Sequence, residues 1–254
     1  MRILVTNDDG ISSPGLHHLA QALTALGDVT VFAPSGEYSG AGAAIGHLGP
    51  GIPDVHAQAP ATIGLPDTCA VYHLDAPPAL TALLACSGLF GAPPDVVVSG
   101  INPGWNIGHA VHFSGTIGAG VTAQVFHTPA LAISQRTTGS TQHWGAAAQA
   151  ALALAPLVAE RGGLWSANAP NVDASDLRGY RQATLCDRIP YGLHSPTLTE
   201  VDPGRFTVDF QRHLAAVGEL DTDAQIVDAG FVAVTALAPT QATIDGGPLP
   251  LPVA

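Results

Sequence analysis

The sequence predicts an α/β fold, namely a doubly wound, Rossmann-like and mostly parallel sheet with a β-rich C-terminal extension. Short apolar runs typical of buried strands alternate with helical patterns as far as Pro170. This order is expected when helices cover both faces of a parallel sheet. After Pro170, strand-like runs separated by proline and glycine replace the helices. A chain of 254 residues that is 46% hydrophobic is also long enough to bury one large core.

The expected elements follow this alternation from the N-terminus. Residues 3–6 form a first strand, and residues 14–23 form a helix in which Pro14 takes the first turn and Ser13 can cap the start. The other core strands are expected at residues 29–33, 95–99, 130–134 and 164–168, and the other core helices at residues 78–84, 114–126 and 141–160.

The C-terminal part has a different pattern. Strands are expected at residues 183–186, 205–210 and 231–235, with turns and little helix between them. We therefore predict a Rossmann-like catalytic core over residues 1–175 and a β-hairpin-rich extension over residues 176–254, together forming one structural domain.

The charge balance excludes several classes of partner. Eight arginines and no lysine stand against 20 acidic residues, so the formal charge is −12. A surface this negative repels nucleic acid polymers and anionic membranes, so an anionic substrate has to be small and attracted by a local positive field. A bound divalent metal would supply that field.

The apolar stretches and the cysteines indicate a cytoplasmic protein without a membrane partner. The longest apolar stretch, residues 144–159, is shorter than the roughly 20 residues that a membrane helix needs. Arg2 leads directly into a strand, unlike the start of a secretory signal. The cysteines at positions 69, 86 and 186 are widely spaced and odd in number, which favours free thiols in a reducing compartment.

Two adjacent carboxylates, Asp8 and Asp9, directly follow the first strand and precede Gly10. Open α/β sheets bind ligands at the carboxyl ends of their strands, so both carboxylates should lie in a binding crevice. Two like charges side by side in such a crevice need a cation. In an isolated Asp-Asp-Gly, Asp9 could instead simply cap the turn.

Three further segments offer polar groups at strand ends or helix starts. Ser39 lies in a Gly-rich loop after the second strand, and Asn102 and Asn106 follow the strand at 95–99. Residues 114–116 open a helix whose free N–H groups can receive a phosphate. Carboxylate, hydroxyl and amide oxygens without imidazole or thiolate suit a hard cation, so we expect Mg²⁺ or Mn²⁺, with Ca²⁺ as a further option.

Taken together, these motifs resemble the SurE family, the survival protein E phosphatases that hydrolyse nucleoside monophosphates. The matching segments keep the family order over nearly the whole chain, and their combination is far more specific than Asp-Asp-Gly alone. They are residues 1–10, 32–34, 39–40, 94–102, 114–116 and 129–134, with weaker matches at 166–170, 222–223 and 230–235.

The resemblance implies a divalent-metal-dependent phosphatase that hydrolyses nucleoside 5′- or 3′-monophosphates with one metal ion per subunit. The implied metal ligands are Asp8, Asp9, Ser39 and Asn102, and the implied phosphate-binding residues are Ser114, Gly115 and Thr116. Asp8 and Asp9 are the expected catalytic residues, with Asp8 hypothesised as the carboxylate nearest the reacting water. Asn106 is a candidate phosphate contact or a loop-structuring residue. A C-terminal hairpin exchanged between subunits is also implied, hence a homodimer or homotetramer.

The chain departs from the family pattern around the predicted site. Residues 75–80 lack the acid and the cysteine that follow a Gly-Thr-Pro segment in the family, and residues 34–38 lack the usual arginine and asparagine. Thr122 and Ala123 stand where Glu-Gly is common. The predicted metal ligands are retained, whereas the substrate pocket is expected to differ.

Three other functions share some of these features. A haloacid-dehalogenase-type phosphatase needs carboxylates two positions apart on the loop after its first strand and a phosphate-clamping lysine, whereas here Asp8 and Asp9 are adjacent and the chain has no lysine. A phosphatase of the same fold acting on a specialised phosphorylated metabolite remains open, as does a metal- or nucleotide-binding protein that has lost catalysis.

His109 and His112 flank the loop before the helix at 114–126, where either could assist proton transfer or simply be exposed.

Overall fold

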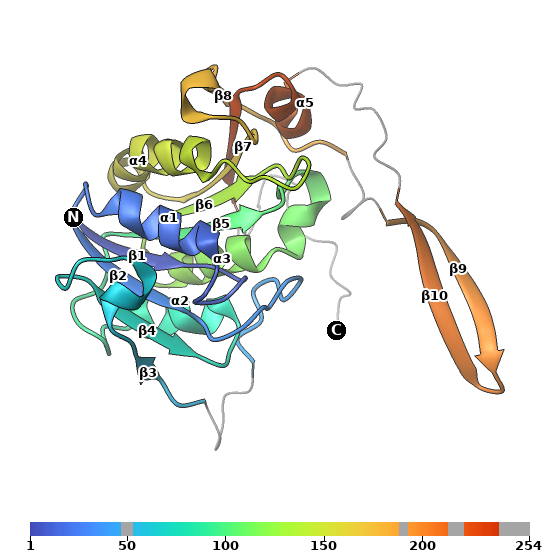
Figure 1. The fold of residues 1–254 in the computed structure, drawn as a ribbon, viewed down its shortest axis with the longest axis horizontal. Coiled ribbons are helices and arrows are strands. Elements are labelled where there is room, and N and C mark those ends of the chain that lie inside the picture. Colours follow the sequence, from blue (N-terminus) through green and yellow to red (C-terminus); the bar gives the residue numbers. More distant parts are fainter. Residues whose placement is uncertain (47–52, 188–192, 213–220, 239–254) are drawn as a thin grey trace, which may run out of the picture.

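The computed structural model describes residues 1–46, 53–187, 193–212 and 221–238 (Figure 1). The helices are α1 (Pro14–Leu23), α2 (Pro78–Cys86), α3 (Gly115–Val125), α4 (Trp144–Arg161) and α5 (Asp223–Asp228). The strands are β1 (Arg2–Thr6), β2 (Asp28–Pro34), β3 (His56–Ala57), β4 (Ala70–Leu74), β5 (Val96–Pro103), β6 (Ala130–Gln135), β7 (Leu164–Ala169), β8 (Tyr180–Gln182), β9 (Leu193–Asp202), β10 (Arg205–Arg212) and β11 (Val232–Leu237).

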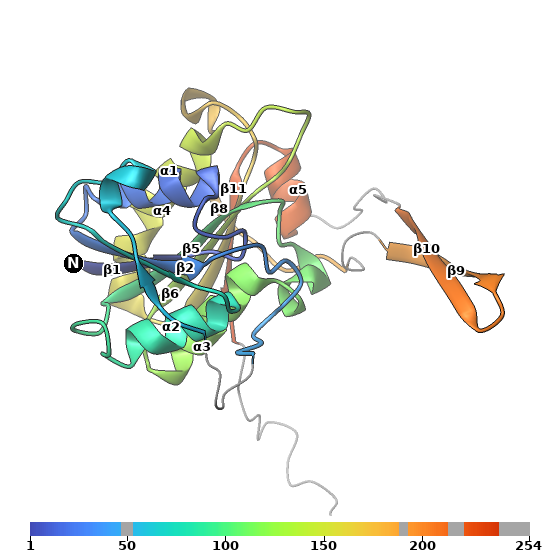
Figure 2. The same ribbon diagram turned by 60° about the horizontal axis from the view of Figure 1, so that its bottom comes forward.

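A nine-stranded sheet in the order β3-β4-β2-β1-β5-β6-β7-β11-β8 forms the centre of the molecule. The strands from β4 to β7 pair in parallel, while β3 and β11 run antiparallel to β4 and β7. Helices α1 and α4 cover one face, and α2 and α3 cover the other (Figure 2). The predicted doubly wound α/β fold is therefore confirmed.

Strand β1 lies in the middle of this sheet because its side chains are buried on both faces. Ile3 and Val5 pack in the core on the α1 and α4 side, and Leu4 packs in the core on the α2 and α3 side. Both neighbours, β2 and β5, run parallel to β1. The residues that follow β1 therefore emerge between the carboxyl ends of two other strands.

Helix α1 begins at Pro14 as predicted, but its capping and the start of α4 differ from the prediction. Ser13 precedes α1, but its hydroxyl makes no capping hydrogen bond; its carbonyl accepts the N–H of His17 instead. Helix α4 begins at Trp144 rather than at residue 141. The preceding loop is held by Asn171, whose amide donates to the carbonyl of Thr141 and whose oxygen accepts the N–H of His143. These bonds keep residues 141–143 outside the helix.

Strand β5 continues past the predicted end at residue 99 through a bulge opposite β6. Gly100 makes this bulge possible: its φ is 139°, and a Cβ there would lie 2.2 Å from the carbonyl oxygen of Ile133. Only glycine adopts such a conformation readily at so close an approach. The bulge brings Asn102 to the carboxyl end of the sheet.

The C-terminal segment is only partly as expected. The strand predicted at residues 183–186 is wrong: β8 ends at Gln182, and Thr184 makes only an isolated bridge to Thr222. The N–H groups of Thr184 and Cys186 bond to the carbonyl of Asp221 and the carboxylate of Asp223 instead of to a neighbouring strand. Strands predicted at 205–210 and 231–235 correspond to β10 and β11.

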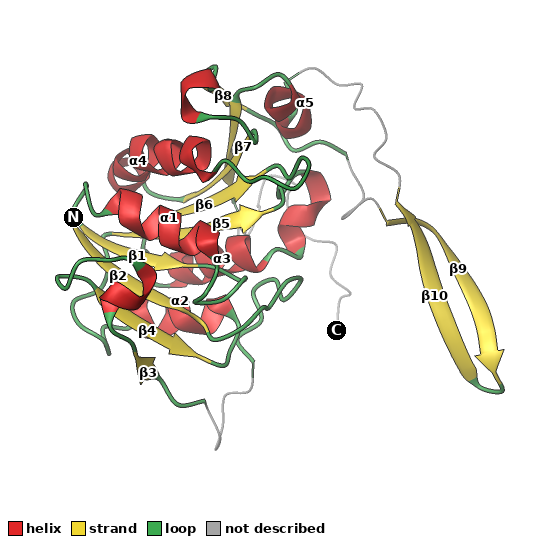
Figure 3. Cartoon of the chain, in the orientation of Figure 1, coloured by secondary structure: helices red, strands yellow, loops and turns green. Residues whose placement is uncertain are grey.

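Residues 176–254 contribute to two different parts of the structure. β8 and β11 extend the main sheet, whereas β9 and β10 form an antiparallel hairpin that projects away from it (Figure 3). Helix α5 and strands β3, β4, β8 and β9 were not predicted. None of the helices in the described ranges is long and apolar enough to cross a membrane. The tail after residue 238 lies outside the described residues.

Candidate active site

Asp8 joins three of the predicted site segments at the carboxyl end of the sheet. Its backbone carbonyl accepts the N–H of Tyr38, in the loop after β2, over 2.7 Å. Its carboxylate accepts the hydroxyl of Thr116, at the start of α3, also over 2.7 Å. Asn102, from the fourth segment, lies on the adjacent strand β5, three residues after the Ser99 that pairs with Thr6.

The Asp8 side chain is almost completely buried against the start of α3. Only 3% of the residue is exposed. A Cβ on Gly115 would come within 2.7 Å of the Asp8 Cβ, so α3 can approach this closely only with glycine. Burial raises the pKa of Asp8, while hydrogen bonds from the Thr116 hydroxyl and from the backbone amides of Thr116 and Gly115 act in the opposite direction.

Asp9 lacks a partner for one of its carboxylate oxygens. Among the described residues, nothing hydrogen-bonds to its buried Oδ2 atom, and the same is true of Oδ1 of the neighbouring Asn7. The pKa of Asp9 is raised to about 7, first by burial and then by the negative charges of Asp8 and Glu37. A cation would remove this electrostatic penalty and satisfy the unpaired oxygen.

The two neutral candidate ligands are held by local hydrogen bonds. Ser39 is exposed and donates its hydroxyl to the carboxylate of Glu37 over 2.8 Å. Asn102 is partly buried, and its amide nitrogen donates to the carbonyl of Gly104 over 2.6 Å. In both residues the hydrogen-donating group is thus engaged, while oxygen lone pairs are left for an acceptor role.

The donor set suits a hard divalent cation. Asp8 and Asp9 provide carboxylates, and Ser39 and Asn102 provide neutral oxygens. The described part of the chain contains no group of three or more histidine, cysteine, aspartate or glutamate side chains able to hold a metal. A site here would therefore depend on the neutral oxygens as well as on the two carboxylates, which is unlike a zinc site built from imidazole or thiolate.

The start of α3 is less available than the sequence predicted. Ser114 is the N-cap residue, and its hydroxyl oxygen accepts the N–H of Ile117 over 3.2 Å. The hydroxyl of Thr116 and the first amides of the helix face the carboxylate of Asp8. A phosphate would therefore share the positive end of the helix with the Asp8 carboxylate. Phosphate binding by residues 114–116 stays a prediction.

Asn106 is anchored by two residues that the sequence reasoning did not single out. Its N–H donates to Oδ1 of Asn168 over 2.7 Å, and its side-chain amide donates to the hydroxyl of Ser134 over 2.8 Å. Ser134 and Asn168 lie near the carboxyl ends of β6 and β7. Their positions were a usable signal, because polar residues at strand ends were the criterion that identified Asp8. A phosphate contact by Asn106 stays a prediction.

Asp223 positions the same segment from the C-terminal side. It is fully buried, and its carboxylate accepts the N–H groups of Gly108, Cys186 and Ala224 over 2.8, 3.1 and 2.8 Å. Gly108 opens the short helical turn that leads towards Ser114. Asp223 therefore ties the C-terminal segment to the loop between β5 and α3.

The loop histidines are at the surface. His109 contacts Asp187 over 3.0 Å, and both side chains are more than half exposed. The ring of His109 stacks on that of His112 with the centroids 6.2 Å apart. A role for either residue in proton transfer stays a prediction.

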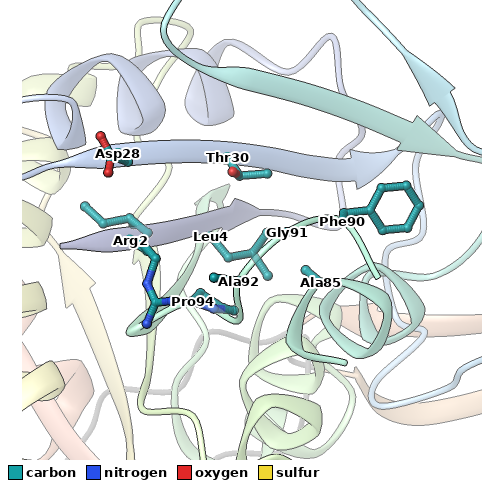
Figure 4. A pocket seen from close by; sticks show the side chains of 10 residues that line it. Arg2, Leu4, Asp28, Thr30, Ala85, Phe90, Gly91, Ala92 and Pro94 are labelled. Carbon is teal, nitrogen blue, oxygen red and sulfur yellow. The ribbon is translucent and has the colours of Figure 1, made fainter. Parts of the chain in front are cut away.

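A pocket of about 180 Å³ lies near the amino-terminal ends of β1 and β2, away from these residues (Figure 4). Arg2, Asp28, Thr30, Phe90 and Pro94 contribute to its lining. It contains none of the predicted site residues. The candidate site is therefore defined by the convergence of side chains at the opposite ends of the strands.

Comparisons with known proteins identify the family of this chain. The family described as "Survival protein SurE" matches residues 3–190. A "5'-nucleotidase SurE" of Geobacter metallireducens is 35% identical over 93% of this chain and 91% of its own length. That of Syntrophotalea carbinolica is 37% identical with the same two coverages. The solved SurE protein of Aquifex aeolicus is similar in fold, with a TM-score of 0.76, 24% identity and 97% of each chain covered. This chain belongs to the SurE family.

Proposed function

We propose that this chain is a divalent-metal-dependent phosphatase that hydrolyses nucleoside 5′- or 3′-monophosphates to nucleoside and phosphate. The observation that carries the proposal is the unpaired, buried carboxylate oxygen of Asp9 beside Asp8 at the carboxyl end of β1. The relatives named 5'-nucleotidase SurE, which match over most of the chain, support the substrate class.

Asp8, Asp9, Ser39 and Asn102 would hold the metal, which we take to be Mg²⁺ or Mn²⁺. When bound, such an ion polarises a phosphoryl oxygen and lowers the pKa of water. The metal dependence is supported by the charge of the site. Burial and two neighbouring carboxylates raise the pKa of Asp9, so three ionised carboxylates repel one another here unless a cation lies between them.

The chain's own residues would position the Asp8 carboxylate and the phosphate of the substrate. Thr116 and the first amides of α3 hold the Asp8 carboxylate in one position, so that it can face the attacking water. Residues 114–116 would bind the phosphate oxygens, because the positive end of the helix stabilises the negative charge on them. Asn106, which is fixed by Asn168 and Ser134, would supply a further polar contact.

The test is phosphate release from a panel of nucleoside 5′- and 3′-monophosphates with Mn²⁺, Mg²⁺ or EDTA. Metal-dependent release that disappears in Asp8→Ala and Asp9→Ala supports the proposal. Variants that fold and still turn over nucleotides at the wild-type rate would overturn the assigned roles. A wild-type protein that binds Mn²⁺ but releases no phosphate from any tested compound would point to a binding protein that has lost catalysis.

A second candidate is a phosphatase of a specialised small metabolite. The hydroxyl of Tyr38 donates to the carboxylate of Asp75 over 2.8 Å. This bond joins two of the three segments that depart from the family pattern, the loop before Ser39 and the turn before α2. Sugar phosphates and cofactor fragments therefore belong in the same panel. A uniform preference for nucleoside monophosphates would exclude this candidate.

We also propose that the protein is a cytoplasmic homo-oligomer, a dimer or a tetramer, assembled through the β9–β10 hairpin. Phe206 and Val208 alternate along β10, and Leu198 lies opposite Val208 in β9, so all three share one face of the hairpin. They are 53%, 51% and 66% exposed, which is the kind of apolar face that subunits bury. Cys69 and Cys86 are buried and form no disulfide, which supports a reducing compartment.

A further inference from the structure

Glu37 touches the candidate metal site through Ser39. The Ser39 hydroxyl has one proton, and it donates that proton to Glu37 over 2.8 Å. The lone pairs of the same oxygen remain free to accept or to coordinate. A neutral hydroxyl is a weak ligand, and donation to a carboxylate increases the electron density on its oxygen.

The loop that carries Glu37 is fixed relative to the two aspartates. The N–H of Tyr38, the next residue, bonds to the Asp8 carbonyl over 2.7 Å. The N–H of Ser35 bonds to the carbonyl of Leu74 over 2.7 Å, which attaches the other side of the loop to β4. The negative charge of Glu37 repels that of Asp9, and this repulsion contributes to the raised pKa of Asp9.

We propose that Glu37 is an outer carboxylate of the metal site: a positioning residue that orients the Ser39 oxygen and adds a negative charge that tightens divalent-cation binding. This inference rests on the proposed function. Glu37 accepts a hydrogen bond from the ligand Ser39 and is not itself a ligand. This agrees with the lack of a three-carboxylate metal cluster in the described ranges. Residues in such outer positions typically change metal affinity by about 10- to 100-fold.

The experiment measures Mn²⁺ binding to the full chain without substrate, by calorimetry and by electron paramagnetic resonance of free Mn²⁺. Glu37→Gln keeps an acceptor for Ser39 but removes the charge, and Glu37→Asp keeps the charge. We expect Glu37→Gln to weaken Mn²⁺ binding by about tenfold, and Glu37→Asp to recover part of the loss. Glu160→Gln, the same change at the end of α4, is the matched control and should bind as the wild type does.

Glu37→Ala, Ser39→Ala and the Ser39→Ala/Glu37→Ala double variant test whether Glu37 acts through the hydroxyl, because alanine removes the acceptor that glutamine keeps. A Glu37→Ala effect that shrinks when Ser39 is alanine supports the proposal, because interacting groups give non-additive effects. Additive effects would overturn the orienting role. Wild-type affinity in Glu37→Gln would overturn the whole inference, whereas a wild-type protein that binds no Mn²⁺ would overturn the proposed function instead. Thermal unfolding without metal verifies that the exposed Glu37 variants fold.

Discussion

The hydroxyl of Thr116 donates to the carboxylate of Asp8 over 2.7 Å, although the two residues are 108 positions apart in the sequence. Both are buried, Thr116 completely. The bond connects the end of β1 to the first turn of α3, so it couples the position of a proposed metal ligand to the proposed phosphate-binding helix. Changes at either residue should therefore affect metal binding and substrate turnover together.

Thr116→Val tests this coupling. Valine has nearly the same shape but cannot donate, so Asp8 loses a hydrogen bond in a buried position. We expect a loss of about 1–3 kcal/mol in the free energy of unfolding and weaker Mn²⁺ binding. Urea unfolding and calorimetry measure the two effects. Thr116→Ser retains the hydroxyl and should stay close to wild type in metal affinity; a loss as large as that of valine would argue against the hydrogen bond as the cause.

Gly115→Ala should disrupt the site by steric contact. The added Cβ would lie 2.7 Å from the Cβ of Asp8 and 2.9 Å from its Oδ2 atom. Asp8 or the start of α3 must then move, so we expect at least a tenfold loss of phosphate release, on the scale of small displacements in catalytic geometry. Gly145→Ala, near the start of α4, is the control because its Cβ would meet Ala174 at an ordinary 3.6 Å. Equal losses in the two variants would refute the steric explanation.

The raised pKa of Asp9 predicts opposite pH dependences for metal binding and for metal-free stability. Its pKa is about 7 in the fold, against a usual value of 3.8, so the fold favours the protonated form. Asp9 therefore stabilises the metal-free fold most below pH 4, and this contribution falls as the pH rises to about 7. Protons compete with Mn²⁺, so affinity should increase over the same range.

Asp9→Asn provides the comparison for this pH dependence. It removes the titrating charge, so the metal-free variant should resist urea better than the wild type at pH 8 and more nearly equally at pH 4. Mn²⁺ binding should be lost at every pH. The burial of Asp8 also raises its pKa and gives an effect of the same sign, which remains in this variant. A variant that is less stable than the wild type at pH 8 would contradict the raised pKa.

The sequence was sufficient for the fold and for the position of the two aspartates. Hydrophobic runs such as Ile3–Val5 identified the parallel strands, because these strands are buried on both faces. The strand end then placed Asp8 and Asp9. The family order of the motifs added Ser39 and Asn102, which single-residue chemistry does not distinguish from ordinary turn residues.

Long-range partners could not be predicted from local patterns. Nothing near residue 116 indicates that its hydroxyl meets Asp8, so the helix start appeared free for phosphate. Asn168 and Asp223 bond to backbone amides of the β5–α3 loop, and these contacts depend on the tertiary fold. The wrong strand at 183–186 has the same origin, because the buried Asp223 takes a backbone N–H that a strand would have used.

Asp223→Asn should loosen the loop between β5 and α3. An amide nitrogen would replace one of the two carboxylate oxygens, so at least one of the N–H groups of Gly108, Cys186 and Ala224 would lose its acceptor. We expect destabilisation by about 1–3 kcal/mol and a larger effect on kcat than on metal affinity. Hydrogen exchange of the Gly108 amide reports the local change. Asp228→Asn, which removes only the partly exposed partner of Arg136, should change stability far less.

The apolar face of the β9–β10 hairpin predicts how subunits assemble. If its apolar face packs on another subunit, Phe206→Ser/Val208→Ser should reduce the molar mass measured by light scattering at micromolar concentration. Thr207 and Asp209 pair with Thr199 and Thr197 and lie on the opposite face, so Thr207→Ser/Asp209→Ser is a matched control that should leave the mass unchanged. Both double variants change only exposed residues of a hairpin that projects from the main sheet, so the core should fold in each. An unchanged mass in the first variant would show that subunits meet elsewhere.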